Sequence, residues 1–173
     1  MKIRMCAATL AVALAPTFLT AQEGAPVAKA LRSTATRMEK QLTAAAEAIP
    51  EDKYAFKPTP AQMSIGEIMA HLAGGNDALC STITGVKRPT REKVAATASK
   101  AALIARLKET FQFCHTALAG LDDSKLGEEL SVFGEKMSRA DLVLETAGDW
   151  ADHYSQLAIY MRLNGLLPPT AKK

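Results

Sequence analysis

The sequence predicts an all-α protein, folded as a single four-helix bundle. Four long segments carry apolar residues at spacings of three and four, the pattern of amphipathic helices, and each is closed by a proline or a glycine. No stretch has the alternating pattern of a convincing strand, and no internal repeat is present. Long second-to-third and third-to-fourth connections allow a topology other than simple up-down.

The N-terminal segment, residues 1–21, is expected to lie outside this fold as a signal peptide. Lys2 and Arg4 precede a short apolar run, and a cleavage site is expected near Ala21. The apolar run is too short to span a membrane. We therefore expect a periplasmic or secreted protein, residues 22–173, that has no membrane attachment after cleavage.

The charge of the chain argues against some classes of partner. Its formal net charge is only +3, and two of the basic residues lie in the expected signal peptide. A chain this close to neutral is not expected to bind nucleic acid or an anionic membrane. A small-molecule substrate and a homodimer are both compatible with the sequence, which does not name the substrate.

The first two helices are expected over residues 27–49 and 64–84, joined by a loop over residues 51–63. The second helix has a specific start signal, because Ser64 is followed three residues later by Glu67. In this capping box each side chain accepts a hydrogen bond from the backbone N–H of the other residue.

A pair of glycines, Gly74 and Gly75, interrupts the second helix. Each is expected to destabilise a helix by about 1 kcal/mol relative to alanine. We therefore expect either a close contact with a neighbouring helix or a local kink at this point.

The third helix is expected over residues 100–118 and the fourth over residues 138–165. Ser138 and Asp141 repeat the pattern of a cap followed by an acid and open the fourth helix. The connection over residues 121–137 is expected to be a long loop. Three of its apolar residues are expected to pack on the core: Leu130, Val132 and Phe133.

Two cysteines remain after cleavage, Cys80 and Cys114. In an oxidising compartment such a pair is expected to form a disulfide, and the alternative is two buried free thiols. Each cysteine lies near the C-terminal end of its helix. A disulfide therefore requires the second and third helices to run parallel, or to be offset along their length.

Three residues on the second and fourth helices could bind a metal ion: His71, Asp149 and His153. Asp149 and His153 are four residues apart, so they lie one turn apart on one face of a largely buried helix. Polar groups there need a partner, because an unpaired polar group in a core costs about 2 kcal/mol or more. Two histidines and a carboxylate suit a divalent first-row metal and leave positions open for water or substrate. Alternatively, Asp149 accepts a hydrogen bond from either histidine.

The other candidates are less specific. His115 has polar neighbours and is expected to face solvent, Asp152 is expected to be exposed or to cap a neighbour, and Trp150 is compatible with plain core. The sequence contains no glycine-rich phosphate loop and no Ser-His-Asp arrangement, and the cysteines have no adjacent base. Catalytic residues are therefore not identified.

Over most of residues 22–173 the chain resembles the DinB-like four-helix metalloproteins. The resemblance lies in four stretches: Tyr54–Pro60, Ser64–Ala73, Asp152–Leu157 and Tyr160–Pro169. In that family, one histidine of the second helix and an HxxxH pair of the last helix bind a divalent metal. His71 and His153 match the first and last of these ligands, and Asp149 stands where the family has its middle histidine. The resemblance also implies thiol S-transferase activity, or a related metal-dependent hydrolase or isomerase activity, for some members.

We therefore expect an exported DinB-like protein that binds a divalent metal ion, Zn, Ni, Mn or Fe, through His71, Asp149 and His153. This arrangement is compatible with a metal-dependent enzyme of the transferase or hydrolase type, whose reaction the sequence does not assign. The alternative is a non-catalytic bundle with a hydrogen-bonded His/Asp core and a binding or structural role. No site for another cofactor is expected.

Overall fold

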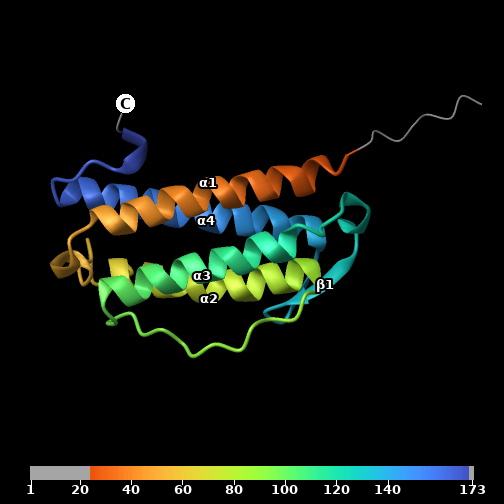
Figure 1. Ribbon diagram of the computed structural model, residues 1–173, viewed down its shortest axis with the longest axis horizontal. Coiled ribbons are helices and arrows are strands. Elements are labelled where there is room, and N and C mark those ends of the chain that lie inside the picture. The colour runs from red at the N-terminus through yellow and green to blue at the C-terminus, as the bar shows by residue number, and fades with distance from the viewer. Residues whose placement is uncertain (1–23, 172–173) are drawn as a thin grey trace, which may run out of the picture.

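A computed structural model describes residues 24–171 as a four-helix bundle, which confirms the all-α prediction (Figure 1). Its long helices are α1 (Pro26–Ala48), α2 (Ile65–Thr84), α3 (Lys100–Leu118) and α4 (Arg139–Leu163). These bounds differ from the predicted ones by at most two residues, and those of α3 are identical. The expected signal peptide, residues 1–21, lies outside the described residues. Within residues 24–171, none of the helices has the length and apolarity needed to cross a membrane.

The helices α2 and α3 run parallel to each other and antiparallel to α1 and α4 (Figure 1). Between α2 and α3, Asn76 contacts Thr110 and Cys80 contacts Cys114, so the separation in sequence stays the same along the pair. A constant separation means that the two helices point the same way. The topology is therefore not simple up-down, a possibility that the long connections had left open.

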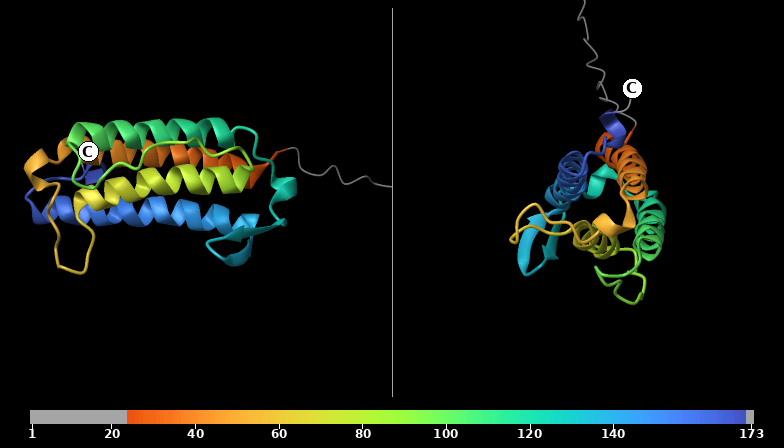
Figure 2. Two further views of the ribbon diagram at one scale, coloured as in Figure 1. Left: turned by 90° about the horizontal axis from the view of Figure 1, so that it is seen from below. Right: turned by 90° about the vertical axis from the view of Figure 1, so that its left-hand side faces the viewer.

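The connection between α2 and α3 makes this arrangement possible. Residues 85–99, here called the crossover segment, travel back along the length of the bundle over the seam between the two helices (Figure 2). Arg91 ties the segment to both helices, because it donates to Asp77 of α2 at 3.0 Å and forms an ion pair with Glu109 of α3. Gly66 lets the segment approach α2, since a Cβ there would lie 2.2 Å from the carbonyl oxygen of Ala96.

The helices α2 and α4 begin at the capping boxes that the sequence predicts. Ser64 Oγ accepts a hydrogen bond from the Glu67 N–H at 3.1 Å, and the Glu67 carboxylate accepts one from the Ser64 N–H at 2.6 Å. Ser138 and Asp141 form the second capping box, at the start of α4. At the other end of α2, Gly85 takes a left-handed conformation, with φ +73°. Both predicted capping boxes are confirmed.

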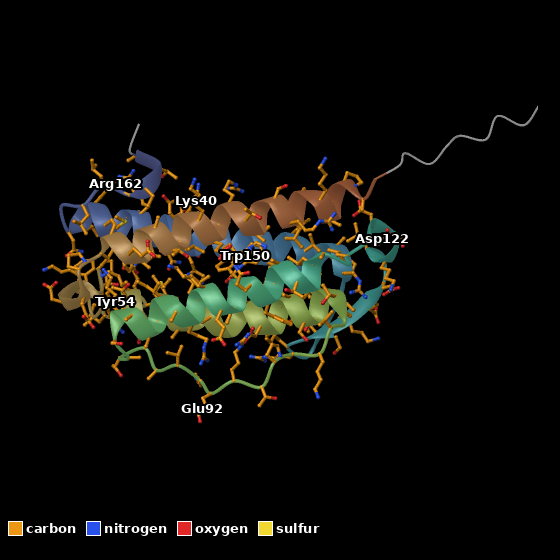
Figure 3. The ribbon with its side chains drawn as sticks, viewed as in Figure 1. Lys40, Tyr54, Glu92, Asp122, Trp150 and Arg162 are labelled. Carbon is orange, nitrogen blue, oxygen red and sulfur yellow. A yellow bond between two sulfur atoms is a disulfide. The ribbon has the colours of Figure 1, made fainter. Side chains whose placement is uncertain are left out.

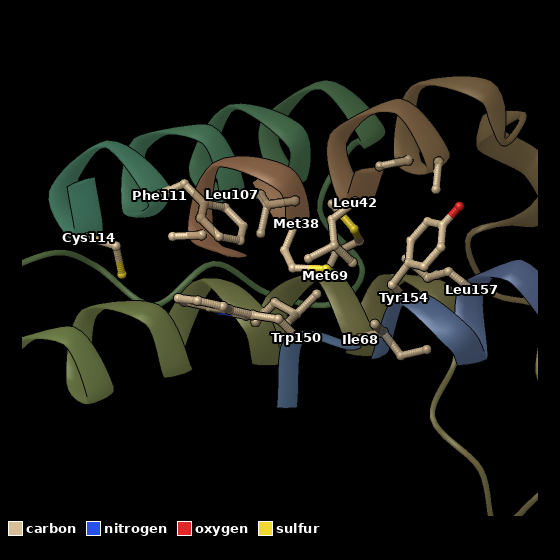
Figure 4. Close-up of a cluster of buried hydrophobic side chains, with 14 of the residues drawn as sticks. Met38, Leu42, Ile68, Met69, Leu107, Phe111, Cys114, Trp150, Tyr154 and Leu157 are labelled. Atoms are coloured by element: carbon tan, nitrogen blue, oxygen red, sulfur yellow. The ribbon is translucent and has the colours of Figure 1, made fainter. Parts of the chain in front are cut away.

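The core is centred on Trp150 of α4, whose side chain points into the bundle, whereas Glu92 of the crossover segment points outward (Figure 3). The ring of Phe111 lies 5.5 Å from that of Trp150, between centroids (Figure 4). The indole N–H donates to Asn76 Oδ1 at 2.7 Å, and the Asn76 amide donates to Thr110 Oγ1 at 3.2 Å. These buried polar groups therefore satisfy one another, as a stable core requires.

A disulfide joins Cys80 and Cys114, whose Cα atoms are 5.3 Å apart. Both residues are fully buried between α2 and α3. The parallel course of the two helices brings their C-terminal halves together, which is the arrangement that a bridge between these positions requires.

The connection between α3 and α4 differs from its prediction. It is not a plain loop, because β1 (Glu129–Val132) and β2 (Glu135–Ser138) form a two-stranded antiparallel hairpin. Val132 is buried and Leu130 is partly buried against the core, as expected, but Phe133 is 86% exposed. Phe133 and Gly134 form the turn, with φ +52° and +89°, as a two-residue hairpin turn of this kind requires.

The close contact with a neighbouring helix, one of the two expectations for the glycine pair in α2, is not found. The helix runs unbroken from Ile65 to Thr84, and a Cβ added at Gly74 would meet no atom within 4 Å. At Gly75 the nearest such atom is Leu79 Cδ1, which is 4.0 Å away and belongs to the same helix. Helix packing therefore does not require glycine at either position.

We expect Gly74→Ala to raise the free energy of unfolding by about 0.5–1 kcal/mol, because alanine loses less backbone entropy in a helix and has space here. Urea denaturation followed by circular dichroism measures this change. Gly66→Ala is the matched control in the same helix, and it should destabilise the protein because its Cβ would collide with Ala96. A loss of stability in Gly74→Ala would contradict the open space found at that position.

We expect the double substitution Cys80→Ala/Cys114→Ala to lower the free energy of unfolding by roughly 3–4 kcal/mol, since a bridge across 34 residues restricts the unfolded chain. Denaturation of the parent protein with and without a reductant is the control. The reduced parent should approach the double variant in stability. Identical curves with and without the reductant would mean that the thiols of the purified protein are free.

Candidate metal centre

The centre lies where α2 and α4 pack antiparallel. Two hydrogen bonds fix the register of these helices on either side of it: Trp150 to Asn76 at 2.7 Å, and the Tyr160 hydroxyl to the Met63 carbonyl at 3.0 Å. On α2, His71 lies between these two contacts. It faces the turn of α4 that begins at Asp149 and ends at His153, so the side chains of these three residues lie close together.

The three predicted residues converge on one oxygen atom. Asp149 Oδ1 lies 3.4 Å from His71 Nε2 and 3.3 Å from His153 Nε2. The imidazole rings meet edge to face, with centroids 4.7 Å apart and planes at 63°. One potential ligand atom from each residue lies within 4.8 Å of the other two.

The centre is closed on one side and open on the other. The His153 side chain is only 8% exposed, that of Asp149 is 27% exposed, and that of His71 is 44% exposed. Solvent therefore reaches the centre from the His71 side, and α4 closes the opposite side. Closed sites are typical of structural zinc, whereas catalytic sites keep a position open.

A second pair of side chains orients His153. Its Nδ1 lies 3.3 Å from Gln156 Oε1, and the Gln156 amide donates to Asp152 Oδ2 at 2.7 Å. The amide orientation presents an acceptor to Nδ1, which favours the ring state in which Nδ1 carries a proton and Nε2 faces Asp149. Sequence reasoning placed Asp152 correctly in solvent but missed this role. The signal was available, since Gln156 follows Asp152 by four residues and His153 by three on one helix.

The pKa values of the buried pair move in opposite directions. Burial alone would raise the pKa of Asp149, but hydrogen bonds and charge from His153, and then from His71, outweigh burial and lower it. Burial alone would lower the pKa of His153, but the hydrogen bond and charge of Asp149 outweigh burial and raise it, with smaller contributions from Gln156 and Asp152. Without a metal ion, the arrangement thus favours an imidazolium beside a carboxylate.

Two of the three donor separations also fit a bound metal ion, and all three donor atoms lie within 4.8 Å of one another. In a tetrahedral zinc site with bonds of about 2.0–2.1 Å, two ligand atoms lie roughly 3.3 Å apart. The two distances to Asp149 Oδ1, 3.4 Å and 3.3 Å, agree with that spacing. An ion between the three groups would replace the protons that they otherwise have to share.

The remaining histidine takes no part in the centre. His115 of α3 lies across the bundle seam from α1, where its Nε2 is 2.7 Å from Glu39 Oε2. It is partly buried, which differs from the solvent-facing position expected. Sequence reasoning missed the partner because Glu39 lies 76 residues away on another helix.

Comparison with known protein families agrees with the fold. The sequence model described as "DinB superfamily" matches residues 34–157. This chain belongs to the DinB superfamily. The matched range contains His71, Asp149 and His153, so all three candidate ligands lie within the DinB domain.

Two solved DinB-like structures share the fold of this DinB superfamily chain. A DinB-like protein from Bacillus subtilis, YjoA, superposes with a TM-score of 0.63 at 21% identity, over 79% of this chain and 92% of its own. Another from Bacillus cereus ATCC 10987 superposes with a TM-score of 0.68 at 16% identity, over 82% of this chain and 95% of its own. At these identities the likeness shows the fold alone. No curated protein matches the chain.

We expect Asp149→Asn to destabilise the metal-free protein by about 1–2 kcal/mol near pH 5, and by less near pH 8.5. Because the pKa of His153 is raised, its protonation stabilises the fold fully at a pH below the ordinary pKa of 6.5. This contribution to stability is lost as the pH rises through the raised pKa. Because the pKa of Asp149 is lowered, its ionised carboxylate stabilises the fold at a pH above the ordinary pKa of 3.8. This contribution to stability is lost as the pH falls through the lowered pKa. The interaction between Asp149 and His153 therefore stabilises the protein most between the two ordinary pKa values, 3.8 and 6.5.

Urea denaturation of chelator-treated protein at both pH values measures this difference. Glu145→Gln, an exposed carboxylate on the same helix, is the matched control and should show no such dependence. Equal destabilisation by Asp149→Asn at the two pH values would mean that the pair is not charged in the folded protein.

Proposed function

We propose that this protein binds one divalent transition-metal ion through His71, Asp149 and His153, and that the bound ion serves a reaction on a small molecule. One observation carries the proposal: two imidazole Nε2 atoms lie within 3.4 Å of a single carboxylate oxygen in a partly buried site. Imidazole and carboxylate ligands together suit Zn, Ni, Mn or Fe.

The proton positions strengthen this proposal. Gln156 occupies Nδ1 of His153, so the Nε2 atom that faces Asp149 holds either a second proton or a lone pair. A lone pair pointing at a carboxylate oxygen is repulsive unless a cation lies between them. At a pH where His153 is neutral, a metal ion supplies that cation, and Gln156 keeps the ring in the orientation that binding needs.

An open side is what distinguishes a reactive site from a structural one. The exposed side of His71 leaves space for water or substrate next to the three ligands. When bound there, a metal ion polarises a substrate group or lowers the pKa of a bound water. The residues of this chain hold the ligand atoms together, fix the His153 tautomer through Gln156, and exclude water on the α4 side. A transferase or hydrolase reaction suits this arrangement.

The second candidate is a non-catalytic bundle. The separations of 3.3 Å and 3.4 Å also suit weak hydrogen bonds from two histidines to Asp149, and the pKa shifts favour a charged pair without metal. In that case the three residues join α2 to α4, and the protein has a binding or structural role.

We also propose that the protein is exported and works in the periplasm or outside the cell. The N-terminal charge and hydropathy pattern supports export, and so does the buried Cys80–Cys114 disulfide, because such bridges persist in oxidising compartments. The low net charge supports a small-molecule partner in preference to nucleic acid.

Metal content distinguishes the two candidate functions. We expect protein purified without a metal-affinity tag to hold about one equivalent of a transition metal by elemental analysis, at once or after reloading. Asp149→Ala should weaken binding by more than about 100-fold, whereas Gln156→Ala, which leaves the ligands intact, should weaken it by about 10–100-fold. Asp149→His should retain binding with a changed metal preference. Affinity should fall as the pH drops through the raised pKa of His153, because protons then compete with the metal ion for that imidazole.

His115→Ala is the matched control, since it removes a histidine that is paired with Glu39 outside the centre. Its metal content should equal that of the parent protein. Less than about a tenth of an equivalent of any transition metal after reloading would favour the non-catalytic bundle. Unchanged affinity in Asp149→Ala would place Asp149 outside the metal's ligands.

A further inference from the structure

A groove of about 980 Å³ runs along α2 beneath the crossover segment and includes His71 among its walls. Its apolar lining comes mainly from small residues of α2 and from the crossover segment, with Phe133 of the hairpin turn at its edge. A space of this volume is at the upper end of the range for small-molecule sites. Because His71 is also the most exposed residue of the candidate metal centre, the groove adjoins the open side of that centre.

The glycine pair keeps the floor of this groove clear. Gly74 and Gly75 both line it, and a Cβ at Gly74 would meet no atom within 4 Å. Any larger side chain at that position would stand in the open space of the groove. Helix packing does not account for two residues that weaken α2, but free passage along the groove does.

The guanidinium group of Arg88 lies next to the glycine pair. Arg88 of the crossover segment lines the groove, and its Nη2 donates to the Gly74 carbonyl at 3.3 Å. The guanidinium has five N–H donors, so several remain for another partner. Among the ion pairs found within residues 24–171, none involves Arg88, whereas Arg91 and Arg106 are both paired with Glu109.

Each of the three acids that line the groove has another partner or faces away. Asp77 is bound to Arg91 at 3.0 Å, and Arg88 interacts with its carboxylate only at longer range. Glu67 is bound to Lys57 at 2.8 Å, and Glu92 points outward (Figure 3). Arg88 is thus an exposed guanidinium beside an apolar floor. Guanidinium groups bind carboxylates in a planar, two-point geometry.

The distance from Arg88 to the metal centre sets the length of a ligand. Arg88 contacts α2 at Gly74, three residues beyond His71, which is roughly 5 Å along the helix axis. A molecule that reaches both ends therefore spans about 5–10 Å, the length of two or three extended amino-acid residues.

We propose that this groove binds a small organic carboxylate, with its carboxylate on Arg88, its apolar part over Gly74 and Gly75, and its far end beside His71. The role of that far end rests on the metal-dependent function proposed above. The binding of the carboxylate does not, because Arg88 and the glycine pair belong to no part of the metal centre.

The test uses chelator-treated full-length protein, so that no metal ion can bind the probe. We expect hexanoate to shift the backbone amide signals of Gly74, Gly75 and Ala78 saturably in two-dimensional NMR spectra. The uncharged isostere hexanamide should bind at least about tenfold more weakly, because it lacks the charge-assisted bonds to Arg88. Butyrate and octanoate test the length of the groove.

Three variants assign the binding to the proposed residues. Arg88→Gln should weaken hexanoate binding by about tenfold or more, and Gly74→Leu should abolish it by filling the floor. Lys87→Gln removes the neighbouring exposed cation, which does not line the groove, and should leave the affinity unchanged. Gly74→Ala should bind more weakly than the parent while its melting temperature rises, which separates blockage from misfolding.

Absence of saturable shifts with all three carboxylates would overturn the proposal. So would equal affinity for hexanoate and hexanamide, or unchanged affinity in Arg88→Gln. A protein that binds metal but not hexanoate would refute only the carboxylate groove. A protein that binds hexanoate in the expected way but takes up no metal would refute only the metal-dependent function.

Discussion

The side chain of Asn76 joins three of the four long helices. It accepts a hydrogen bond from Trp150 of α4 and donates one to Thr110 of α3, and it is only 1% exposed. A buried amide that loses one of these partners costs about 1–3 kcal/mol, so sliding either neighbour along α2 is opposed. The register that this amide maintains places His71 opposite Asp149 and His153, and Cys80 opposite Cys114. The candidate metal centre and the disulfide thus depend on the same packing.

The parallel pairing of α2 and α3 has a structural consequence for the outer surface. Two consecutive helices can run in the same direction only if their connection returns along the whole bundle, and the crossover segment does so over their seam (Figure 2). The segment needs anchors at both helices, which Arg91 provides, and a close approach, which Gly66 permits. Where it stands clear of α2 it forms a wall of the groove. The parallel pairing of α2 and α3 therefore accounts both for the position of the disulfide and for the groove beside the candidate metal centre.

The sequence predicted the features that depend on local spacing. The capping boxes at Ser64 and Ser138 lie within single turns, and the Asp149–His153 pair has a spacing of one helical turn, so periodicity was sufficient. The hairpin was missed because its strands have only four residues each and its turn is Phe133–Gly134, not a common Asn-Gly turn. The open space at Gly74 was also missed, because it lies beneath a segment that returns over α2 from later in the chain, and no local pattern encodes that return.

Asp149 links the electrostatics of the centre to those of the groove. Two neutral imidazoles and one carboxylate would leave a divalent ion with a net charge of about +1, whereas three imidazoles would leave +2. A site with less positive charge binds an anionic group less strongly by itself. Recognition of an anionic molecule then has to come from a second cation, and Arg88 stands about one turn along α2 from His71. The carboxylate in the centre and the arginine over the groove are in this sense complementary. One lowers the charge where a reaction would occur, and the other supplies charge where a ligand would be held.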